Sequence, residues 1–438
     1  MDIKLPGADS LCGFEIETLG QAKFDSPMVG SKCKFISDDE KVCFYSHSQG
    51  VKELESRGDD PCMIERAGPR EKIYFDPASL KCGIVTCGGL CPGLNDVIRT
   101  VVLTLFWDYG VKTIYGFRYG YAGMVEGEYA EPYMLTPEKV DEIHLKGGDI
   151  LSSSRGPQDT DKIVDGLVDK GIKLMFVIGG DGTMKGAQEL AGRIKERGLE
   201  ISVIGIPKTI DNDLMGVERS FGFSTAVEAA RPAIVGAHEE AKGAWNGVGL
   251  VKLMGRDSGF IAAYATLANS DVNFCLVPEV AVSLGGEGGF LKALDERLER
   301  KHHALIVVAE GVGKCLRGDN YLKRDASGNL IYGDVGVLLK KKIIEYFEQE
   351  GKCVTVKYID PSYIIRSCPA NSSDSAYCLL IGQNAVHAGM AGKTNMLVGY
   401  WNQYYTHIPI SFAIRARNKI DPEGDLWQSV ITTTGQKF

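Results

Sequence analysis

The chain has 438 residues, of which 44% are hydrophobic and 24% charged, and its formal net charge is −8. This length exceeds one ordinary core and suits two domains of about 150 to 200 residues each, plus an extension. The composition is typical of a globular protein and excludes a disordered or membrane class. The negative balance argues against a general nucleic-acid binder, although a phosphate substrate needs only local positive charge.

Targeting signals are missing from the sequence. No run of about 18 apolar residues occurs, and no apolar signal core follows Met1–Pro6. We therefore expect a soluble protein with no membrane partner, and the end Gln436–Phe438 is not a peroxisomal address, so the default location is cytoplasmic. The 12 cysteines are scattered and indicate reduced thiols. Cys87 and Cys91 lack the further ligands of a zinc site.

The pattern of apolar residues changes near Lys81. Residues 1–80 show little periodic apolar pattern and carry turn-rich stretches around 37–39 and 55–61, which predicts an N-terminal extension. From Lys81 onward, short apolar runs alternate with helical segments. This alternation is typical of an α/β fold with mostly parallel sheets and helices on both faces.

Five of the apolar runs end in glycines or polar groups. These predicted strands are Cys82–Thr86, Leu174–Ile178, Ser202–Ile206, Val248–Leu253 and Ala304–Ala309. Because ligands bind outside the carboxyl ends of the strands in open parallel sheets, we expect these ends to converge on a cleft.

The first candidate motif is GGDGT, Gly179–Thr183, between a predicted strand and a predicted helix. Glycines let backbone N–H groups approach phosphate oxygens, and the helix N-terminus adds attraction. Asp181 is suited to hold Mg²⁺. Diacylglycerol kinases and NAD kinases use a similar loop, and glycine-rich turns are also common structural features, so GGDGT alone leaves these alternatives open.

The second motif is PKTIDND, Pro207–Asp213, again directly after a strand. In an extended segment Asp211 and Asp213 point the same way, so one can accept a hydroxyl proton while the other helps to hold Mg²⁺. Phosphoryl transfer needs in-line positioning, charge neutralisation and a base beside the nucleophile. The alternative is an Asx turn with solvated acids.

The third motif is MGRDSG, Met254–Gly259. Gly255 allows close backbone approach, and Arg256 offers planar donors to sugar hydroxyls or phosphate oxygens. The alternative is an ordinary helix start capped by Asp257 or Ser258. Further candidate cations are Arg155, Lys357 and Arg366.

Taken together, the motifs resemble those of the phosphofructokinases, in the same order along the chain. They are CGGLCPGLNDVIR, GGDGT, PKTIDND, GFSTAVE, MGRDSG, the AEG around Glu310 and KYIDPSYIIR. The resemblance covers about Arg66 to Gly392, and RAGPREKIYF before the first strand is similar to the long-chain branch. That branch contains both ATP-dependent and pyrophosphate-dependent members.

The resemblance implies two Rossmann-like domains with the active site in the cleft between them, plus the N-terminal extension. It implies a nucleotide-binding domain at 81–222 plus 366–408 and a fructose 6-phosphate-binding domain at 223–365 plus 409–438. The implied activity is ATP-dependent phosphorylation of fructose 6-phosphate at its 1-hydroxyl, a step of glycolysis, with Mg²⁺ as cofactor. The implied assembly is a homodimer or homotetramer.

The family's site residues carry over position by position. Asp211 is implied as general base, Asp181 and Asp213 as Mg²⁺ ligands, and Thr209, Lys208 and Arg155 as groups beside the transferred phosphoryl. The residues implied to line the nucleotide are Gly88, Gly89, Tyr121, Arg155, Gly180, Asp181, Gly182 and Thr183. Those implied to bind the sugar phosphate are Thr209, Asp211, Met254, Gly255, Arg256, Glu310, Lys357, Tyr363 and Arg366.

Three positions depart from the short bacterial pattern. Those enzymes have a basic residue seven positions before the Met-Gly-Arg methionine, which here is Gly247, so part of the phosphate clamp must come from elsewhere. Tyr363 stands where they have a histidine. Of two effector-site arginines, Arg99 is kept but the second position is Leu103, so their allosteric control is not implied.

Two positions in the sequence bear on which phosphoryl donor the enzyme uses. Pyrophosphate-dependent members carry Asp after the loop Asp and Lys after the Pro, whereas this chain has Gly182 and Lys208. A side chain at 182 would occupy and repel the space that an α-phosphate needs, so Gly182 favours ATP over pyrophosphate. A non-catalytic sugar-phosphate-binding subunit is a further alternative, and the acidic motif residues argue against it.

Overall fold

The computed structural model describes residues 13–45, 48–57, 62–125, 131–154, 156–317, 323–324, 330–331 and 333–438. The chain divides into two compact units. One contains the described residues up to Gly222 together with Cys368–Ala416, and the other contains Phe223–Ser367 and Arg417–Phe438. The chain thus returns to the first unit after residue 367 and leaves it after residue 416, rather than after 365 and 408 as expected from the sequence.

The first unit is built on a seven-stranded sheet in the order β19-β18-β10-β9-β6-β7-β8. Its strands are β6 (Lys81–Thr86), β7 (Thr113–Phe117), β8 (Tyr133–Met134), β9 (Leu174–Gly179), β10 (Ser202–Pro207), β18 (Met396–Trp401) and β19 (Tyr404–Pro409). The pairs β7–β8 and β18–β19 are antiparallel, and the other pairs are parallel.

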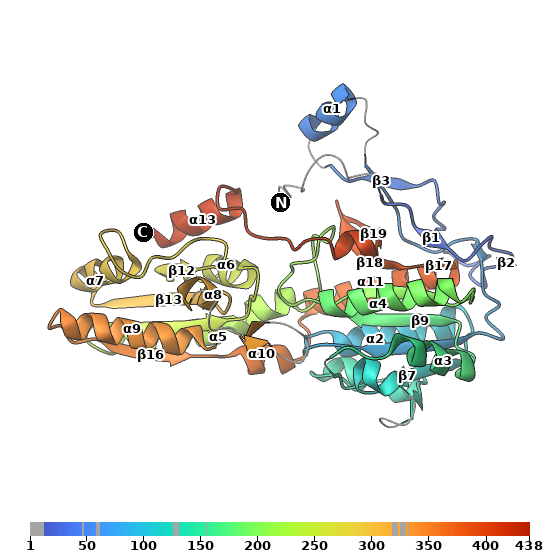
Figure 1. Ribbon diagram of the computed structural model, residues 1–438, viewed down its shortest axis with the longest axis horizontal. Coiled ribbons are helices and arrows are strands. Elements are labelled where there is room, and N and C mark those ends of the chain that lie inside the picture. The colour runs from blue at the N-terminus through green and yellow to red at the C-terminus, as the bar shows by residue number, and fades with distance from the viewer. Residues whose placement is uncertain are drawn as a thin grey trace. The chain divides into compact units, whose positions relative to one another are not determined.

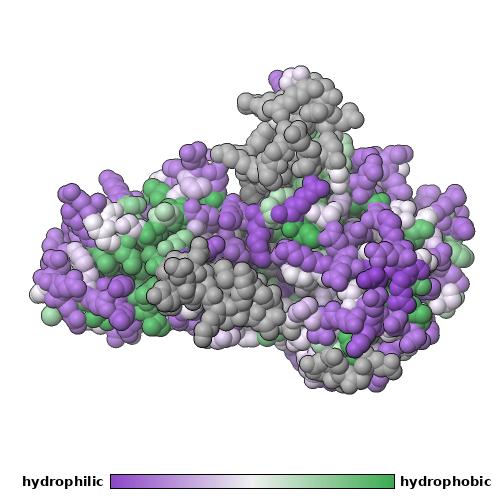
Figure 2. Space-filling model, in the orientation of Figure 1, coloured by the Kyte–Doolittle hydropathy of each residue, from purple (hydrophilic) through white to green (hydrophobic). Residues whose placement is uncertain are grey.

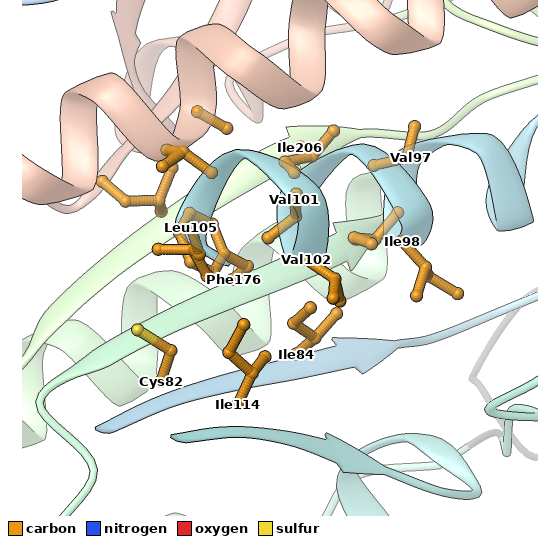
Figure 3. Packing of buried hydrophobic residues seen from close by; sticks show 14 of the residues in the cluster. Cys82, Ile84, Val97, Ile98, Val101, Val102, Leu105, Ile114, Phe176 and Ile206 are labelled. Carbon is orange, nitrogen blue, oxygen red and sulfur yellow. The ribbon is translucent and has the colours of Figure 1, made fainter. Parts of the chain in front are cut away.

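Helices cover both faces of this sheet (Figure 1). They are α2 (Leu94–Leu103), α3 (Thr160–Lys170), α4 (Asp181–Glu196), α11 (Ser372–Met390) and α12 (Ile410–Ala413). Helix α2 and the helical turn that follows it, Thr104–Asp108, lie on the sheet, where Val101, Val102 and Leu105 belong to one apolar cluster with Phe176 and Ile206 (Figure 3). Because both faces are covered, β9 and β10 are buried along their whole length and read as continuous apolar runs.

The N-terminal segment is part of this unit. It contains β1 (Glu17–Thr18), β2 (Phe24–Asp25), β3 (Lys41–Cys43), α1 (Ser48–Arg57), β4 (Met63–Glu65) and β5 (Lys72–Ile73). Strand β1 pairs with β17 (Lys393–Thr394). The Phe44 ring stacks on Trp401 at 4.5 Å, and the Trp401 indole donates a hydrogen bond to the Phe44 carbonyl oxygen at 2.7 Å. The segment is therefore fixed to the sheet by its own small core.

The second unit has a parallel four-stranded sheet in the order β12-β13-β11-β16. Its strands are β11 (Gly247–Leu253), β12 (Phe274–Leu276), β13 (His303–Ala309) and β16 (Thr355–Ile359), with a short pair β14 (Lys323–Arg324) and β15 (Leu330–Ile331). Its helices are α5 (Phe223–Lys242), α6 (Phe260–Leu267), α7 (Phe290–Lys301), α8 (Val312–Arg317), α9 (Val335–Gln349), α10 (Ser362–Ser367) and α13 (Asp425–Thr434).

Helices α7 and α9 share one apolar core with this sheet, through residues such as Leu294, Leu339 and Ile306. Both units therefore have the layered arrangement of Rossmann-like domains, and the predicted α/β class is confirmed. All five strands predicted from the sequence are present, three of them in the first sheet and two in the second.

The surface is mixed in character. Hydrophilic side chains cover most of the face drawn in Figure 2, and apolar side chains gather in smaller groups on it. Within the described parts of the chain, no helix has both the length and the apolar character needed to cross a membrane.

Candidate active site

Three neighbouring strand ends of the first unit meet through backbone hydrogen bonds. The Cys87 N–H after β6 donates to the carbonyl oxygen of Ile178 on β9 at 2.9 Å, and the Lys208 N–H after β10 donates to that of Gly179 at 2.8 Å. Because β10, β9 and β6 are parallel neighbours, their carboxyl ends lie at one edge. This edge brings three of the predicted motifs together.

Lys208, directly after β10, contacts the glycine loop after β6. Its side chain is buried, and its ammonium donates a hydrogen bond to the Gly89 carbonyl oxygen at 2.7 Å. Gly88 has φ 87°, and a Cβ added to it would lie 3.1 Å from the Lys208 nitrogen. The lysine thus holds this loop as well as placing a cation beside it.

The GGDGT motif forms the start of α4. Gly180 is the N-cap residue, and Asp181 is the first helical residue, with an ion pair to Lys185 at 2.9 Å. A Cβ added to Gly182 would meet nothing within 4 Å, so this position faces open space. The exposed N–H groups and positive end of a helix start are suited to phosphate oxygens.

Tyr121 braces this helix start. Its hydroxyl donates a hydrogen bond to the Thr183 carbonyl oxygen at 2.9 Å, and its ring lies where a side chain on Gly186 would have to go. Burial raises the pKa of Tyr121 well above its ordinary value, so the phenol stays a neutral donor.

The acidic loop after β10 is fixed by Asn212. Asn212 has φ 54°, its carboxamide oxygen accepts from the Ser220 N–H at 2.7 Å, and its carboxamide nitrogen donates to the Glu218 carbonyl oxygen at 3.0 Å. Asp213 is buried and accepts a hydrogen bond from the Thr209 hydroxyl at 2.7 Å. The loop therefore presents its carboxylates from a rigid turn.

The extended conformation expected for this segment is wrong. A left-handed residue between Asp211 and Asp213 breaks the alternation of side chains that an extended chain would give. Asn tolerates this conformation because its short side chain bonds to nearby backbone. The alternative of solvated acids does not hold for Asp213, which is 2% exposed.

In the second unit, the ends of β11 and β13 bring Arg256 and Glu310 together. Their side chains are 3.9 Å apart and about one third exposed, at 31% and 34%. Gly255 has φ 118°, and its carbonyl oxygen accepts from the Gly311 N–H at 2.9 Å. Met254, two residues before Arg256, is buried. A guanidinium beside a carboxylate offers both donors and acceptors to a sugar.

The start of α6 differs from the expected cap. Gly259 is the N-cap residue, and its N–H donates to the Glu279 carboxylate at 2.9 Å. The same Glu279 oxygen accepts from the Ile420 N–H at 3.0 Å. Burial raises the pKa of Glu279. The N-cap residue is therefore Gly259 rather than Asp257 or Ser258, a distant carboxylate binds its N–H, and nothing local in the sequence indicated this contact.

The remaining predicted sugar residues lie on β16 and α10. Arg366 stacks over the Tyr363 ring at 4.9 Å, and Tyr363 is 78% exposed. Lys357 instead pairs with Glu240 at 3.5 Å and lies opposite Gly249, away from the carboxyl end of β11. Within this unit the structure brings Arg366 and Tyr363 together and does not bring Lys357 to them.

Gly247 is required by the backbone. It is the first residue of β11, and a Cβ added to it would collide with the Ala241 carbonyl oxygen and lie 2.8 Å from the carbonyl carbon. A basic side chain, as in the short bacterial pattern, therefore cannot stand here without a backbone shift.

Arg155 lies outside the described residues. The segment before it is anchored at the strand edge. The Thr86 hydroxyl donates to Asp149 at 2.7 Å, and the Ser153 hydroxyl donates to the Gly88 carbonyl oxygen. Burial raises the pKa of Asp149, despite the hydrogen bond from Thr86. The sequence analysis missed both Asp149 and Ser153, although Ser153 lies only two residues before Arg155.

The candidate metal ligands of this site suit Mg²⁺ better than a metal ion that protein side chains alone would hold. No group of three or more His, Cys, Asp or Glu with metal-binding geometry occurs among the described residues. Mg²⁺ is commonly bound by one or two carboxylates plus substrate phosphates and water. Asp181, at the start of α4 after β9, and Asp213, in the loop after the neighbouring strand β10, are carboxylates of the kind that this mode of binding requires.

The phosphofructokinase family model matches residues 81–389. This chain belongs to the phosphofructokinase family. Two bacterial relatives named ATP-dependent 6-phosphofructokinase cover nearly the whole chain. That of Borreliella burgdorferi is 49% identical over 97% of this chain and 96% of its own. That of Amycolatopsis methanolica is 46% identical over 96% of this chain and 94% of its own.

Solved phosphofructokinases share the fold at low identity. A pyrophosphate-dependent phosphofructokinase from Marinobacter aquaeolei aligns over 81% of this chain and 91% of its own, with a TM-score of 0.66 and 19% identity. The Pichia pastoris phosphofructokinase aligns over 76% of this chain and 35% of its own, with a TM-score of 0.62 and 20% identity. At these identities the likeness concerns the fold alone.

Proposed function

We propose that this phosphofructokinase transfers the terminal phosphoryl group of ATP to the 1-hydroxyl of fructose 6-phosphate and yields fructose 1,6-bisphosphate. The observation that carries the proposal is the edge where the glycine loop, the start of α4 and the acidic loop meet. Phosphoryl transfer needs positioning and charge neutralisation more than covalent chemistry. The names of the relatives support the same activity.

The donor would be held by the first unit. Backbone N–H groups of Gly180–Thr183 and the positive end of α4 would bind phosphate oxygens, and Gly88 and Gly89 would allow the nucleotide to approach. Lys208 would neutralise charge near the transferred group, and Arg155 is proposed for the same task. Mg²⁺, when bound by Asp181 and Asp213, would reduce the charge on the phosphates.

The acceptor would be held by the second unit and activated by Asp211. Arg256, Glu310 and Met254 would bind the sugar, while Tyr363 and Arg366 would bind the sugar and its 6-phosphate; the position of Lys357 beside Glu240 does not support the role expected for it. Asp211 would accept the proton of the 1-hydroxyl as the new bond between its oxygen and the terminal phosphorus forms and the bond from that phosphorus to the bridging oxygen breaks, releasing ADP. Thr209, whose hydroxyl bonds to Asp213, would keep that carboxylate in place.

ATP is proposed as donor because position 182 is open. With nothing within 4 Å of a Cβ at Gly182, the space beside Asp181 is free for an α-phosphate. An Asp there, as in pyrophosphate-dependent members, would occupy this space with negative charge.

A coupled assay with fructose 6-phosphate and either ATP or pyrophosphate tests the proposal. We expect turnover with ATP. Turnover with pyrophosphate and none with ATP would overturn the choice of donor.

A second test concerns the general base. Asp211→Ser should reduce kcat by about 100- to 10,000-fold while leaving fructose 6-phosphate binding nearly unchanged. Equal losses in binding and rate would contradict the role of general base.

Two further proposals rest on family membership. We expect a homodimer or homotetramer, which light scattering coupled to gel filtration measures directly. A cytoplasmic location also stays a proposal, because one Arabidopsis thaliana relative, 46% identical over 85% of this chain, is named as chloroplastic. Fractionation of the source cells tests it.

A further inference from the structure

A lysine on β11, one of the two inner strands of the second sheet, lies between two carboxylates. The Lys252 ammonium is 2.6 Å from a carboxylate oxygen of Asp360 and 3.5 Å from one of Asp334. Its side chain is only 12% exposed. Burial alone would lower the pKa of Lys252, but the two carboxylates raise it above its ordinary value, so the lysine is a cation.

Asp360 leads directly into α10. One oxygen of its carboxylate accepts from the Ser362 N–H at 3.1 Å and from the Ser362 hydroxyl at 2.5 Å, while the other pairs with Lys252. Asp360 therefore fixes the first residue of the helix, and Lys252 fixes Asp360.

Helix α10 depends on such support. It has six residues, and helices shorter than about 12 residues are marginal on their own. Ile365 is fully buried, but Tyr363 and Ile364 are 78% and 73% exposed. The buried side chain of Ile365 and the contacts of Asp360 therefore help to hold the helix that carries Tyr363 and Arg366.

Lys252 also precedes the other half of the proposed sugar site. It lies two residues before Met254, and the negative charge of Glu310 contributes to its raised pKa. Asp334, its second partner, is the N-cap of α9 and accepts a hydrogen bond from the Tyr358 hydroxyl at 2.7 Å. Four elements, β11, β16, α9 and α10, are therefore tied to one ammonium.

We propose that Lys252 is a positioning residue for the sugar-phosphate site, which holds α10 in place through Asp360 relative to the Arg256–Glu310 pair on the neighbouring strand ends. The identity of the ligand in this inference rests on the proposed function. The ion pair that links Lys252 through Asp360 to α10 does not depend on that function. The lysine acts through Asp360 rather than by touching the substrate, because its ammonium is already engaged by two carboxylates.

The test compares Lys252→Met with Lys352→Met. Lys352 offers a matched control, because its ammonium also contacts two carboxylates, Asp295 at 2.6 Å and Glu299 at 2.8 Å. Those partners lie on α7, which precedes β13, at the opposite end of the sheet from α10. Both variants remove a lysine with two acidic partners, but only one removes the support of α10.

We expect Lys252→Met to raise the KM for fructose 6-phosphate about 10- to 100-fold with a smaller change in kcat and no change in the KM for ATP. Lys352→Met should change each constant by about twofold or less. Equal effects of the two variants would overturn the proposal. Lys252→Arg should recover part of the loss, since it restores a cation beside Asp360.

Amide hydrogen exchange gives a readout that does not depend on turnover. In Lys252→Met the amides of residues 362–367 should exchange about tenfold faster than in the wild type, and those of α7 should not change. If the amides of α10 exchange at the wild-type rate in Lys252→Met, the proposal is wrong, even if the kinetic constants of the variant differ from those of the wild type. If Lys252→Met does not fold, Asp360→Asn removes the same ion pair and carries the same expectations.

The two proposals can fail separately. If the wild type does not phosphorylate fructose 6-phosphate, the proposed function fails, and the exchange experiment still decides whether Lys252 holds α10.

Discussion

The Lys208 ammonium donates a hydrogen bond to the Gly89 carbonyl oxygen at 2.7 Å. This bond joins the residue after β10 to the loop after β6, two strands that are separated by β9 in the sheet. Lys208 is 7% exposed, so its charge is held inside the protein. The residue therefore has two tasks, to shape the glycine loop and to place a cation at the proposed donor site.

Replacing Lys208 by Met should impair the use of ATP more than the use of sugar. The variant loses both the charge and the bond to Gly89, and a hydrogen bond to a charged group contributes about 1.5 to 3 kcal/mol. We expect kcat/KM for ATP to fall about 10- to 100-fold in steady-state kinetics. Lys195→Met is a suitable control, because Lys195 pairs with Glu17 at the surface. A Lys208→Met enzyme with unchanged constants for ATP would contradict both tasks.

Adding a carboxylate at position 182 should disfavour ATP. Gly182 faces open space at the start of α4, so Asp fits there sterically and acts through its charge. We expect Gly182→Asp to lower kcat/KM for ATP at least about tenfold, the equivalent of about 1.4 kcal/mol.

Gly192→Asp controls for a new carboxylate on the same helix. A Cβ at Gly192 also meets nothing within 4 Å, but the residue lies ten positions further along α4. It should leave the constants for ATP unchanged. If both variants lose ATP turnover equally, the residue at position 182 does not determine which phosphoryl donor the enzyme uses.

The strands next to the site could be predicted because burial on both faces makes them continuous apolar runs. The hairpin of β18 and β19 gave no such signal. Its turn uses Asn402 and Gln403, both with positive φ, instead of the glycine that normally marks a tight hairpin. The packing of the N-terminal segment was also missed, because Phe44 and Trp401 are far apart in the sequence.

The motifs indicated which residues belong to the site but not how they are held. Asp211 and Asp213 were found from their spacing, whereas the left-handed Asn212 between them depends on Ser220 and Glu218. In the sequence, Lys252 was recognisable only as a polar residue inside a predicted strand. Its partners Asp334 and Asp360 lie more than 80 residues further along the chain, and a contact at that separation leaves no periodic pattern.

A methyl group at position 247 should destabilise the second unit. The Cβ of Gly247→Ala would collide with the backbone at the end of α5, and backbone cannot move aside as a flexible side chain can. We expect a loss of about 1 to 3 kcal/mol in the free energy of unfolding, measured by urea denaturation. Gly236→Ala, inside α5 with nothing within 4 Å of the new Cβ, should instead be neutral or stabilising. Equal stabilities of the two variants would contradict the collision.

A buried histidine should make the stability of the first unit depend on pH. His387 is 8% exposed, and its Nδ1 lies 2.8 Å from the Tyr109 hydroxyl. Burial, together with the charges of Arg70 and His407, lowers the pKa of His387 from 6.5 to about 4. A lowered pKa means that the unfolded chain binds the proton more readily, so stability is present above pH 6.5 and is lost as the pH falls toward 4.

The variant His387→Gln removes this dependence and keeps a polar side chain near Tyr109. Between pH 7 and pH 5 the wild type should lose about 2 kcal/mol more free energy of unfolding than the variant does. Urea denaturation at both pH values measures the difference. Glu65, whose pKa is lowered from 4.5 to about 2 by His407 and Lys393 against the effect of burial, does not interfere, because its contribution is lost only below pH 4.5. Parallel losses in the two proteins would show that His387 takes up its proton equally well in the folded chain.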